Sequence, residues 1–185
     1  MALTEFDTAL FTLLNSKWHA AWLDWAMPKI TNFFIDVYPF VVLCIIVMIA
    51  GRARGLVTGA LMVLALAFSN VVTGSWLKPL FGRPRPFAAL EDVRLLIPPP
   101  ASMSFPSTHA TISFAVAVVV AFRHPRAAVW IFGWAVLMAY TRAYVGVHYP
   151  SDLLGGAIAG TLIGWGLVLT EKGIRRAAVR TVKDR

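Results

Sequence analysis

Residues 55–77 read GLVTGALMVLALAFSNVVTGSWL and decide the fold, because these 23 residues contain no Asp, Glu, Lys or Arg. A helix that crosses the hydrocarbon core of a bilayer needs about 20 mainly apolar residues, so this segment is long enough to span a membrane. Residues 153–170 qualify in the same way. Three more charge-free stretches reach this length when flanking residues are included: residues 37–51 with Phe33, Phe34 and Asp36, a stretch that ends in residues 108–122, and residues 127–141 with residues 143–146.

The composition favours a membrane protein over a soluble or disordered one. Hydrophobic residues make up 58% of the 185-residue chain and charged residues only 14%, whereas a soluble domain carries about 25% charged residues. Ala, Leu, Val and Ile dominate the apolar stretches, and they lack the alternating pattern of a β-barrel. The single cysteine, Cys44, excludes an intramolecular disulfide. We therefore predict an all-α fold, a polytopic membrane helix bundle of about five spans.

The first 32 residues differ from the rest of the chain. Apolar residues recur there at roughly helical spacing among charged ones: Leu3, Phe6, Leu10, Leu13, Leu14 and Trp18. Trp18, Trp22 and Trp25 then cluster, as indole rings do at the level of the lipid headgroups. This pattern predicts an N-terminal interfacial amphipathic helix in residues 1–32, with a short sixth span as the alternative. The membrane bundle would occupy residues 33–171, and a basic tail would occupy residues 172–185.

The distribution of basic residues predicts the orientation in the membrane. The turns after the first and third predicted spans and the tail together carry ten Lys and Arg residues and two acidic ones, a net charge of +8 that equals that of the whole chain. With five spans these regions share one side, which the positive-inside rule assigns to the cytoplasm. The loops 78–105 and 142–151 then face the periplasm or the cell exterior. Because the excess charge is a topology signal, we expect no nucleic-acid partner.

Polar residues outside the tail gather in three clusters. These are residues 78–86 (KPLFGRPRP), residues 104–109 (SFPSTH) and residues 142–152 (RAYVGVHYPSD). Each cluster lies at the outer end of a predicted helix, so we expect the three to converge on one pocket at the membrane surface.

The cations of this pocket suit the binding of phosphate. Lys78, Arg85 and Arg142 supply positive charge, and the guanidinium forks match tetrahedral oxyanions. Ser107 and Thr108 follow Pro106 and open a helix, whose free backbone N–H groups point at an anion with the helix dipole behind them.

The two histidines supply the groups that phosphate transfer needs. His109 and His148 offer one ring for attack and one for proton transfer. Asp152 follows His148 by four residues and can bind its Nδ1, which leaves Nε2 unprotonated as a nucleophile. A metal site is the competing interpretation, but three fixed cations would repel a divalent ion, so we expect no metal.

Each of these residues also has a purely structural interpretation. Three cations could simply anchor a helix end at the interface: Lys78, Arg83 and Arg85. This alternative is strongest for Arg83. Ser107 could act as a helix N-cap. His109 could be a satisfied core residue, and His148 and Asp152 could form a structural hydrogen bond at a helix start.

The three clusters together resemble the signature of the type-2 phosphatidate phosphatase superfamily, which also includes the vanadium haloperoxidases. The family pattern is Lys-x6-Arg-Pro, then Pro-Ser-Gly-His, then Ser-Arg-x5-His-x3-Asp. This chain has Lys78-x6-Arg85-Pro86, Pro106-Ser107-Thr108-His109 and Thr141-Arg142-x5-His148-x3-Asp152. The resemblance extends over roughly residues 24–171. It departs from the pattern at Thr108, where the family has glycine, and at Thr141, where it has serine.

The resemblance implies a role for each residue. His148 would attack phosphorus and form a phosphohistidine, with Asp152 orienting it, and His109 would protonate the leaving group and later activate water. The phosphoryl oxygens would be held by Lys78, Arg85, Ser107, the backbone at Thr108, and Arg142. Thr108, a β-branched residue in place of the family glycine, could narrow the pocket or shift substrate choice, and its hydroxyl could add a donor. The family requires no metal or other cofactor.

The family resemblance also implies an integral-membrane hydrolase whose substrate is a lipid phosphate of the bilayer. In its small size and outward-facing site the chain resembles bacterial enzymes of the plasma (inner) membrane that convert undecaprenyl diphosphate to undecaprenyl phosphate. A lipid A 1-phosphatase or a phosphatidylglycerophosphate phosphatase is the alternative, and a non-catalytic lipid-phosphate binder or transporter is the alternative from another class. Gly156, Gly160 and Gly164 form a small-residue stripe that favours tight packing inside the bundle over a dimer contact.

Overall fold

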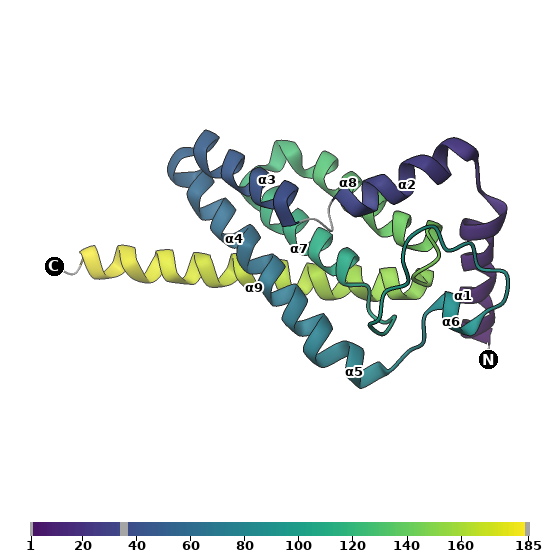
Figure 1. The fold of residues 1–185 in the computed structure, drawn as a ribbon. Helices are drawn as coiled ribbons and strands as arrows, with labels where there is room; N and C mark the ends of the chain where they lie inside the picture. Colours follow the sequence, from purple (N-terminus) through teal and green to yellow (C-terminus); the bar gives the residue numbers. More distant parts are fainter. Residues whose placement is uncertain (1, 34–36, 184–185) are drawn as a thin grey trace.

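The computed structural model describes residues 2–33 and 37–183, and all the secondary structure in these ranges is helical, which confirms the predicted all-α class (Figure 1). Residues 34–36, which the predicted first span borrows, and residues 184–185 of the predicted tail lie outside the described residues. In chain order the elements are α1 (Ala2–Thr12), η1 (Leu13–Lys17), α2 (Ala21–Phe33), α3 (Val37–Ala50), α4 (Arg52–Val71), η2 (Val72–Leu77), α5 (Lys78–Phe81), α6 (Pro86–Ala89), α7 (Thr108–Arg123), η3 (Pro125–Ala127), α8 (Ala128–Tyr144) and α9 (Pro150–Lys183).

Helix α7 is the centre of the bundle and packs against α4, α8 and α9. Its apolar sequence supplies side chains in several directions, so it can be surrounded by other helices. The main core cluster takes Met62 and Ala65 from α4, Ala115 and Val119 from α7, and Val168 from α9, all nearly inaccessible. In Figure 1 these helices lie side by side, and the final turns of α9 extend beyond the other helices.

The glycine stripe of α9 lies against α7. A Cβ added at Gly156 would lie 2.6 Å from the backbone oxygen of Ser107, and one at Gly164 would lie 2.7 Å from that of Ala115. These distances are shorter than side-chain contacts allow, so only glycine permits the two helices to approach this closely. The predicted packing role inside the bundle is confirmed, and the stripe is not available as a dimer contact.

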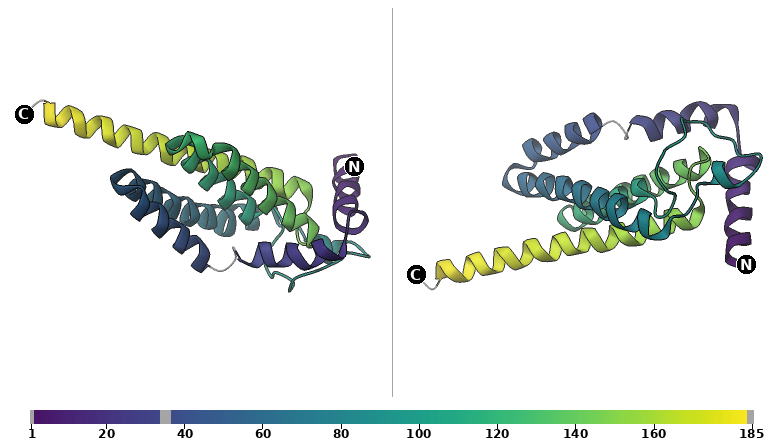
Figure 2. Two further views of the ribbon diagram at one scale, coloured as in Figure 1. Left: turned by 90° about the horizontal axis from the view of Figure 1, so that it is seen from above. Right: turned by 60° about the horizontal axis from the view of Figure 1, so that its bottom comes forward.

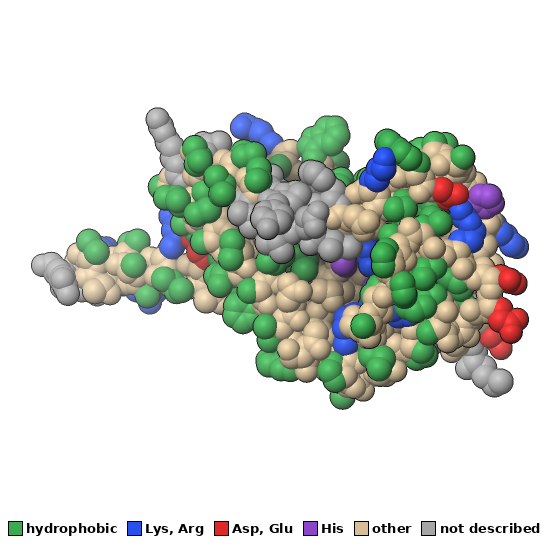
Figure 3. Space-filling view, viewed as in Figure 1, with side chains coloured by type: hydrophobic (Ala, Val, Ile, Leu, Met, Phe, Trp, Pro, Cys, Tyr) green, Lys and Arg blue, Asp and Glu red, His purple; other side chains and the backbone are tan. Residues whose placement is uncertain are grey.

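Two described stretches are long and apolar enough to cross a membrane, residues 53–89 and α9. Three other predicted spans are shorter helices, with 14 residues in α3, 16 in α7 and 17 in α8. At about 1.5 Å per residue they are shorter than the roughly 30 Å hydrocarbon core. On the face that Figure 3 shows, apolar side chains are exposed along the bundle, as a lipid-facing surface requires. The arrangement of about five spans stays a prediction.

The N-terminal segment packs across one end of the bundle (Figure 2). Asp7, Phe11 and Asn15 are spaced by four residues and are buried. The amide of Asn15 donates to the backbone oxygens of Arg94, at 2.9 Å, and Tyr144, at 2.8 Å. The tryptophans at positions 18, 22 and 25 are exposed. The segment is therefore divided into α1 with η1 and then α2, and the side chains that it buries against the bundle are not the predicted apolar set, because Phe6 and Trp18 are exposed. Its placement at the bilayer interface stays a prediction.

The loop between α6 and α7 runs across the ends of the helices, at the same end of the bundle as α1 (Figure 2). Ile97 of the loop joins a second core cluster with Met27 of α2 and Tyr144 of α8. Gly146 has φ +88°, and a Cβ there would lie 2.6 Å from the backbone oxygen of Arg94. Glycine at this position therefore lets the loop pack directly on the turn that carries His148.

Candidate active site

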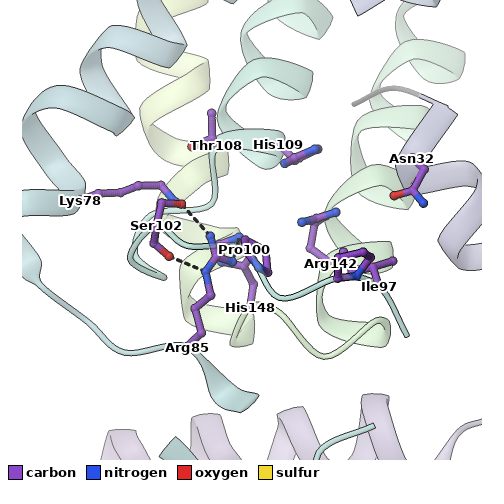
Figure 4. Close-up of a pocket in the computed structure, with 11 residues that line it drawn as sticks. Asn32, Lys78, Arg85, Ile97, Pro100, Ser102, Thr108, His109, Arg142 and His148 are labelled. Atoms are coloured by element: carbon purple, nitrogen blue, oxygen red, sulfur yellow. Dashed lines mark hydrogen bonds between the residues drawn. The ribbon is translucent and has the colours of Figure 1, made fainter. Parts of the chain in front are cut away.

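The three predicted clusters converge on one cavity of about 450 Å³ (Figure 4). Six of the eight predicted site residues line it: Lys78, Arg85, Thr108, His109, Arg142 and His148. The other two, Ser107 and Asp152, are completely buried beside it. Residues that the sequence did not single out complete the lining: Asn32 of α2 and Ile97, Pro98, Pro100 and Ser102 of the long loop. The expected convergence therefore occurs at the ends of α5, α7, α8 and α9.

His148 lies in the turn before α9, with Asp152 in the first turn of that helix. Its Nδ1 is 3.4 Å from Oδ2 of Asp152, and its Nε2 is 3.1 Å from Nη1 of Arg85. A guanidinium can only donate, so Nε2 is the accepting, unprotonated nitrogen and Nδ1 carries the proton. Burial, with the positive charges of Arg85, Arg142 and Lys78, lowers the pKa of His148 well below 6.5. The ring is therefore neutral at pH 7, and the lone pair of Nε2 is directed at Arg85, which lines the cavity together with His148.

The carboxylate of Asp152 is fixed by further hydrogen bonds. Its Oδ2 accepts from the hydroxyl of Ser104, at 2.6 Å, and from the backbone N–H of Tyr149, at 2.9 Å. Its Oδ1 accepts from Nη1 of Arg83, at 2.7 Å. Asp152 is thus held from both sides and presents one oxygen to His148.

Three buried cations surround the cavity. Lys78, Arg85 and Arg142 are 6%, 5% and 2% exposed. Lys78 donates to the backbone oxygen of Met103 at 2.6 Å, and Arg85 donates through Nε to that of Ser102 at 2.6 Å. These contacts are to neutral oxygens, and none of the three cations has an ion-pair partner among the described residues. Burying a charge without a counter-ion is costly, so the cavity is built to receive an anion.

Two buried polar atoms at the site lack a partner among the described residues. They are Nε of Arg142 and the hydroxyl oxygen of Ser107. Ser107 occupies the N-cap position of α7, yet its side chain makes no capping hydrogen bond, so the N-cap alternative accounts for its position and not for its hydroxyl. An unsatisfied buried group costs about 1–3 kcal/mol. A bound oxyanion would satisfy both atoms.

Thr108 and His109 form the first turn of α7. The hydroxyl of Thr73 donates to the backbone oxygen of Ser69 at 2.7 Å, so the 2.9 Å contact between Thr73 and Thr108 has Thr108 as the donor. In this structure the Thr108 hydroxyl is therefore bonded to Thr73 of η2, and its expected role as a donor to phosphate stays a prediction. His109 lines the cavity and has no hydrogen-bond partner in the described ranges, which does not fit a satisfied core residue.

Arg83 is the clearest residue that the sequence interpretation misjudged. The sequence offered helix-end anchoring as an alternative for it, but its Nη1 donates to Asp152 and, at 2.6 Å, to the hydroxyl of Ser151. Its Nη2 donates to Oδ2 of Asp7 in α1 at 2.6 Å. The motif spacing identified Arg85 but gave no signal for Arg83, and nothing local connects Asp7 to a site more than seventy residues away in the chain.

Comparison with known proteins agrees with this geometry. The PAP2 superfamily matches residues 58–176. A lipid A 4′-phosphatase from Bacteroides thetaiotaomicron is 31% identical over 184 residues, covering 88% of this chain and 76% of that protein. An undecaprenyl-diphosphatase from Sulfolobus acidocaldarius is 32% identical over 162 residues, covering 86% of this chain and 76% of that protein.

A solved structure has the same fold. The transmembrane PAP2 type phosphatidylglycerolphosphate phosphatase from Bacillus subtilis superposes with a TM-score of 0.73 and 25% identity, covering 94% of this chain and 88% of that chain. The chain therefore belongs to the PAP2 superfamily, as its three motifs predicted. It is a membrane-embedded lipid phosphatase, a hydrolase of phosphoric esters.

Proposed function

We propose that the protein hydrolyses undecaprenyl diphosphate to undecaprenyl phosphate and inorganic phosphate through a phosphohistidine intermediate. The observation that carries the proposal is the neutral His148 in a cavity lined by three cations. Two buried donors without a partner among the described residues, the Ser107 hydroxyl and Nε of Arg142, lie at the same site. A nucleophile, its orienting carboxylate and an anion site occur together there. The undecaprenyl-diphosphatase relative supports this substrate class.

In the first step Nε2 of His148 attacks the terminal phosphorus. A nitrogen–phosphorus bond forms, the bond to the bridging oxygen breaks, and His109 transfers its proton to that oxygen as lipid phosphate leaves. In the second step His109 takes a proton from water, whose oxygen attacks phosphorus. Inorganic phosphate then leaves and His148 is restored.

The cations and the start of α7 stabilise the charge that develops in both steps. Lys78, Arg85 and Arg142 offer donors to the equatorial oxygens, with the Ser107 hydroxyl and the Thr108 backbone N–H. Because this positive set already neutralises the phosphoryl group, and would repel a divalent ion, the proposed reaction is independent of metal.

The proposed topology has about five spans, with the cavity facing the periplasm or cell exterior and α9 ending in the cytoplasm. It rests on the basic residues Arg54, Arg123 and Arg126 and the basic tail, all at the end of the bundle opposite His148. In a chain with Cys44→Ala, we expect a membrane-impermeant maleimide on intact cells to label Asp92→Cys but not Arg126→Cys. The reverse labelling would invert the topology.

The deciding experiment is phosphate release by the detergent-purified protein, with EDTA present. Undecaprenyl diphosphate, lipid A, phosphatidylglycerophosphate and phosphatidic acid are compared, and we expect the first to have the highest kcat/KM. A lipid A preference would favour the lipid A phosphatase alternative, which the Bacteroides relative supports. His148→Ala should abolish turnover, whereas His19→Ala, at an exposed position in the N-terminal segment, should not. If phosphate is released from none of the lipids, the non-catalytic binder is the function that remains. Loss of activity in EDTA would refute the metal-free mechanism.

A further inference from the structure

Asp152 uses its two carboxylate oxygens for different purposes. Oδ2 faces Nδ1 of His148 and accepts from Ser104 and Tyr149, while Oδ1 accepts from Arg83. Asp152 is fully buried, so its charge needs a partner in the protein. Arg83 is the cation bound to it. The orientation of His148 therefore depends on where Arg83 is held.

Arg83 is itself held by the N-terminal helix. Oδ2 of Asp7 accepts from Arg83, and the two oxygens of Asp7 also bind Ser151, through its N–H at 2.8 Å and its hydroxyl at 2.5 Å. The guanidinium stacks on the ring of Tyr149 at 4.0 Å, and that ring packs against Phe11 of α1. Helix α1 is thereby bonded to the first turn of α9, where Asp152 lies.

We propose that Arg83 and Asp7 are positioning residues for the nucleophile, so that the N-terminal helix is part of the catalytic apparatus. This inference rests on the proposed function, because it assigns them a role through Asp152 and His148. Arg83 fixes the carboxylate and offsets its charge, and Asp7 fixes Arg83. Neither residue lines the cavity, and so neither touches the substrate.

The test removes the positive charge of Arg83 in one variant and the negative charge of Asp7 in another. The charged or titratable groups that face His148 are Lys78, Arg85, His109, Arg142 and Asp152, and none of them is substituted in the variants. In Arg83→Gln the negative charge of Asp152 is less compensated, so protonated His148 is favoured and the acid limb of kcat/KM moves to higher pH by about half a unit or more. In Asp7→Asn a negative charge is lost and the limb moves to lower pH.

Both variants should lower kcat about tenfold or more, because the ring is less well oriented, with KM changed less than about threefold. Arg83→Lys, which keeps the charge, should return the limb to its wild-type pH. A wild-type limb and kcat in both Arg83→Gln and Asp7→Asn would overturn the inference, as would shifts of the same sign. If one variant does not fold, the other still gives its predicted direction. Absence of turnover in the wild type and in all variants would instead refute the proposed function.

A groove at the other end of the bundle carries a second, independent inference. It has a volume of about 530 Å³ and lies between α4, the end of α7 and α9. Its lining holds Arg54, Arg123 and Arg175 against one acid, Glu171, which lies 3.7 Å from Arg175, and the rest of the lining is mainly aliphatic side chains. Arg123 is only 9% exposed and lies 3.3 Å from Glu171. His109 lies in the first turn of α7 and Arg123 ends that helix, so the groove lies about 20 Å from the cavity.

We infer that this groove binds an anionic phospholipid, with its phosphate on the arginines and one acyl chain along the aliphatic lining. The three guanidinium groups carry more positive charge than the one carboxylate offsets, so the groove favours an anion. Leu64 and Ile174 are exposed beside the arginines, so the ligand must carry a hydrocarbon chain next to its charge. A free phosphate would leave this aliphatic lining uncovered.

Phosphatidylglycerol added to the detergent-purified protein should raise its Tm by about 2 °C or more, whereas phosphatidylcholine and inorganic phosphate should not. The double variant Arg54→Gln with Arg175→Gln should lose this response. The matched control, Arg176→Gln with Arg180→Gln, removes the same charge from the exposed end of α9 and should keep it. Equal responses in the two double variants, or an equal effect of phosphatidylcholine or of inorganic phosphate, would overturn the inference.

Discussion

The close packing of α7 on α9 can be tested by adding one methyl group at Gly160. A Cβ at this position would overlap the backbone oxygen of Thr111 and lie 3.0 Å from the backbone nitrogen of Ala115. Both neighbours are backbone atoms of a helix, which cannot rotate away as a flexible side chain can. The two helices must therefore separate to accommodate Gly160→Ala.

The expected magnitude follows from two opposing effects. Overpacking a well-packed interior costs typically about 1–3 kcal/mol. Replacing a helical glycine with alanine contributes about 0.5–1 kcal/mol of stability, because the unfolded chain has less freedom to lose. Gly160→Ala should therefore lower the free energy of unfolding by about 1–2 kcal/mol. At Gly166 and Gly173 of the same helix a Cβ meets nothing within 4 Å, so only the stabilising effect applies.

The assay is thermal unfolding of the detergent-purified variants at one scan rate, followed by tryptophan fluorescence. For a chain of this size 1 kcal/mol corresponds to about 2–4 °C, so Gly160→Ala should have a Tm about 2–8 °C below the wild type. Gly166→Ala and Gly173→Ala should be equal to or above the wild type. A Tm for Gly160→Ala as high as for the two controls would refute the packing argument.

Three further outcomes follow from the site and its surroundings. The acid limb of kcat/KM should lie below pH 6.5, because burial and the neighbouring cations lower the pKa of His148; a limb above pH 6.5 in a pH–rate profile would contradict this. Thr108→Gly should change kcat less than about threefold in the release assay, because the hydroxyl bonds Thr73. Hydrogen bonds from Arg94 and then Tyr144 lower the pKa of Asp24 below 3.8, so this carboxylate stabilises the protein above pH 3.8 and the stabilisation is lost as the pH falls through the lowered pKa. Asp24→Asn should lower Tm at pH 7 and reduce its dependence on pH below 4, as thermal scans at several pH values would show.

The convergence of the three motifs was predictable because each motif lies next to the end of an apolar helix. Lys78, His109 and Arg142 were therefore constrained to one end of the bundle by chain topology alone. The spacing of His148 and Asp152 within one helical turn likewise predicted their contact. Local sequence carries such information, because it depends on helix period and helix ends.

Contacts between distant segments could not be read in this way. Asp7 looked like one of several charges on an amphipathic helix, and no periodicity says which bundle residue such a charge will meet. From its position in the sequence, Arg83 could anchor a helix end, and only the tertiary fold brings its guanidinium into a hydrogen bond with Asp152. The orientation of the Thr108 hydroxyl depends on Thr73, whose position is set by helix packing. The number of spans depends on helix bounds, and α3, α7 and α8 are short in the described part of the chain.

The bonds between Asp7 and Ser151 join residues 144 positions apart, and this separation bears on biogenesis. The chain is synthesised from its N-terminus, so α1 is complete long before α9 emerges. Asp7 can meet Arg83 once the first third of the bundle is made, but Ser151 and Asp152 arrive only with the last helix. The contacts that hold His148, the proposed nucleophile, therefore form late in assembly. On the proposed function, a nascent or truncated chain that lacks α9 would carry Lys78 and Arg85, the cations proposed to bind phosphate, without Asp152 to orient His148, and we expect it to hold lipid phosphate but not cleave it.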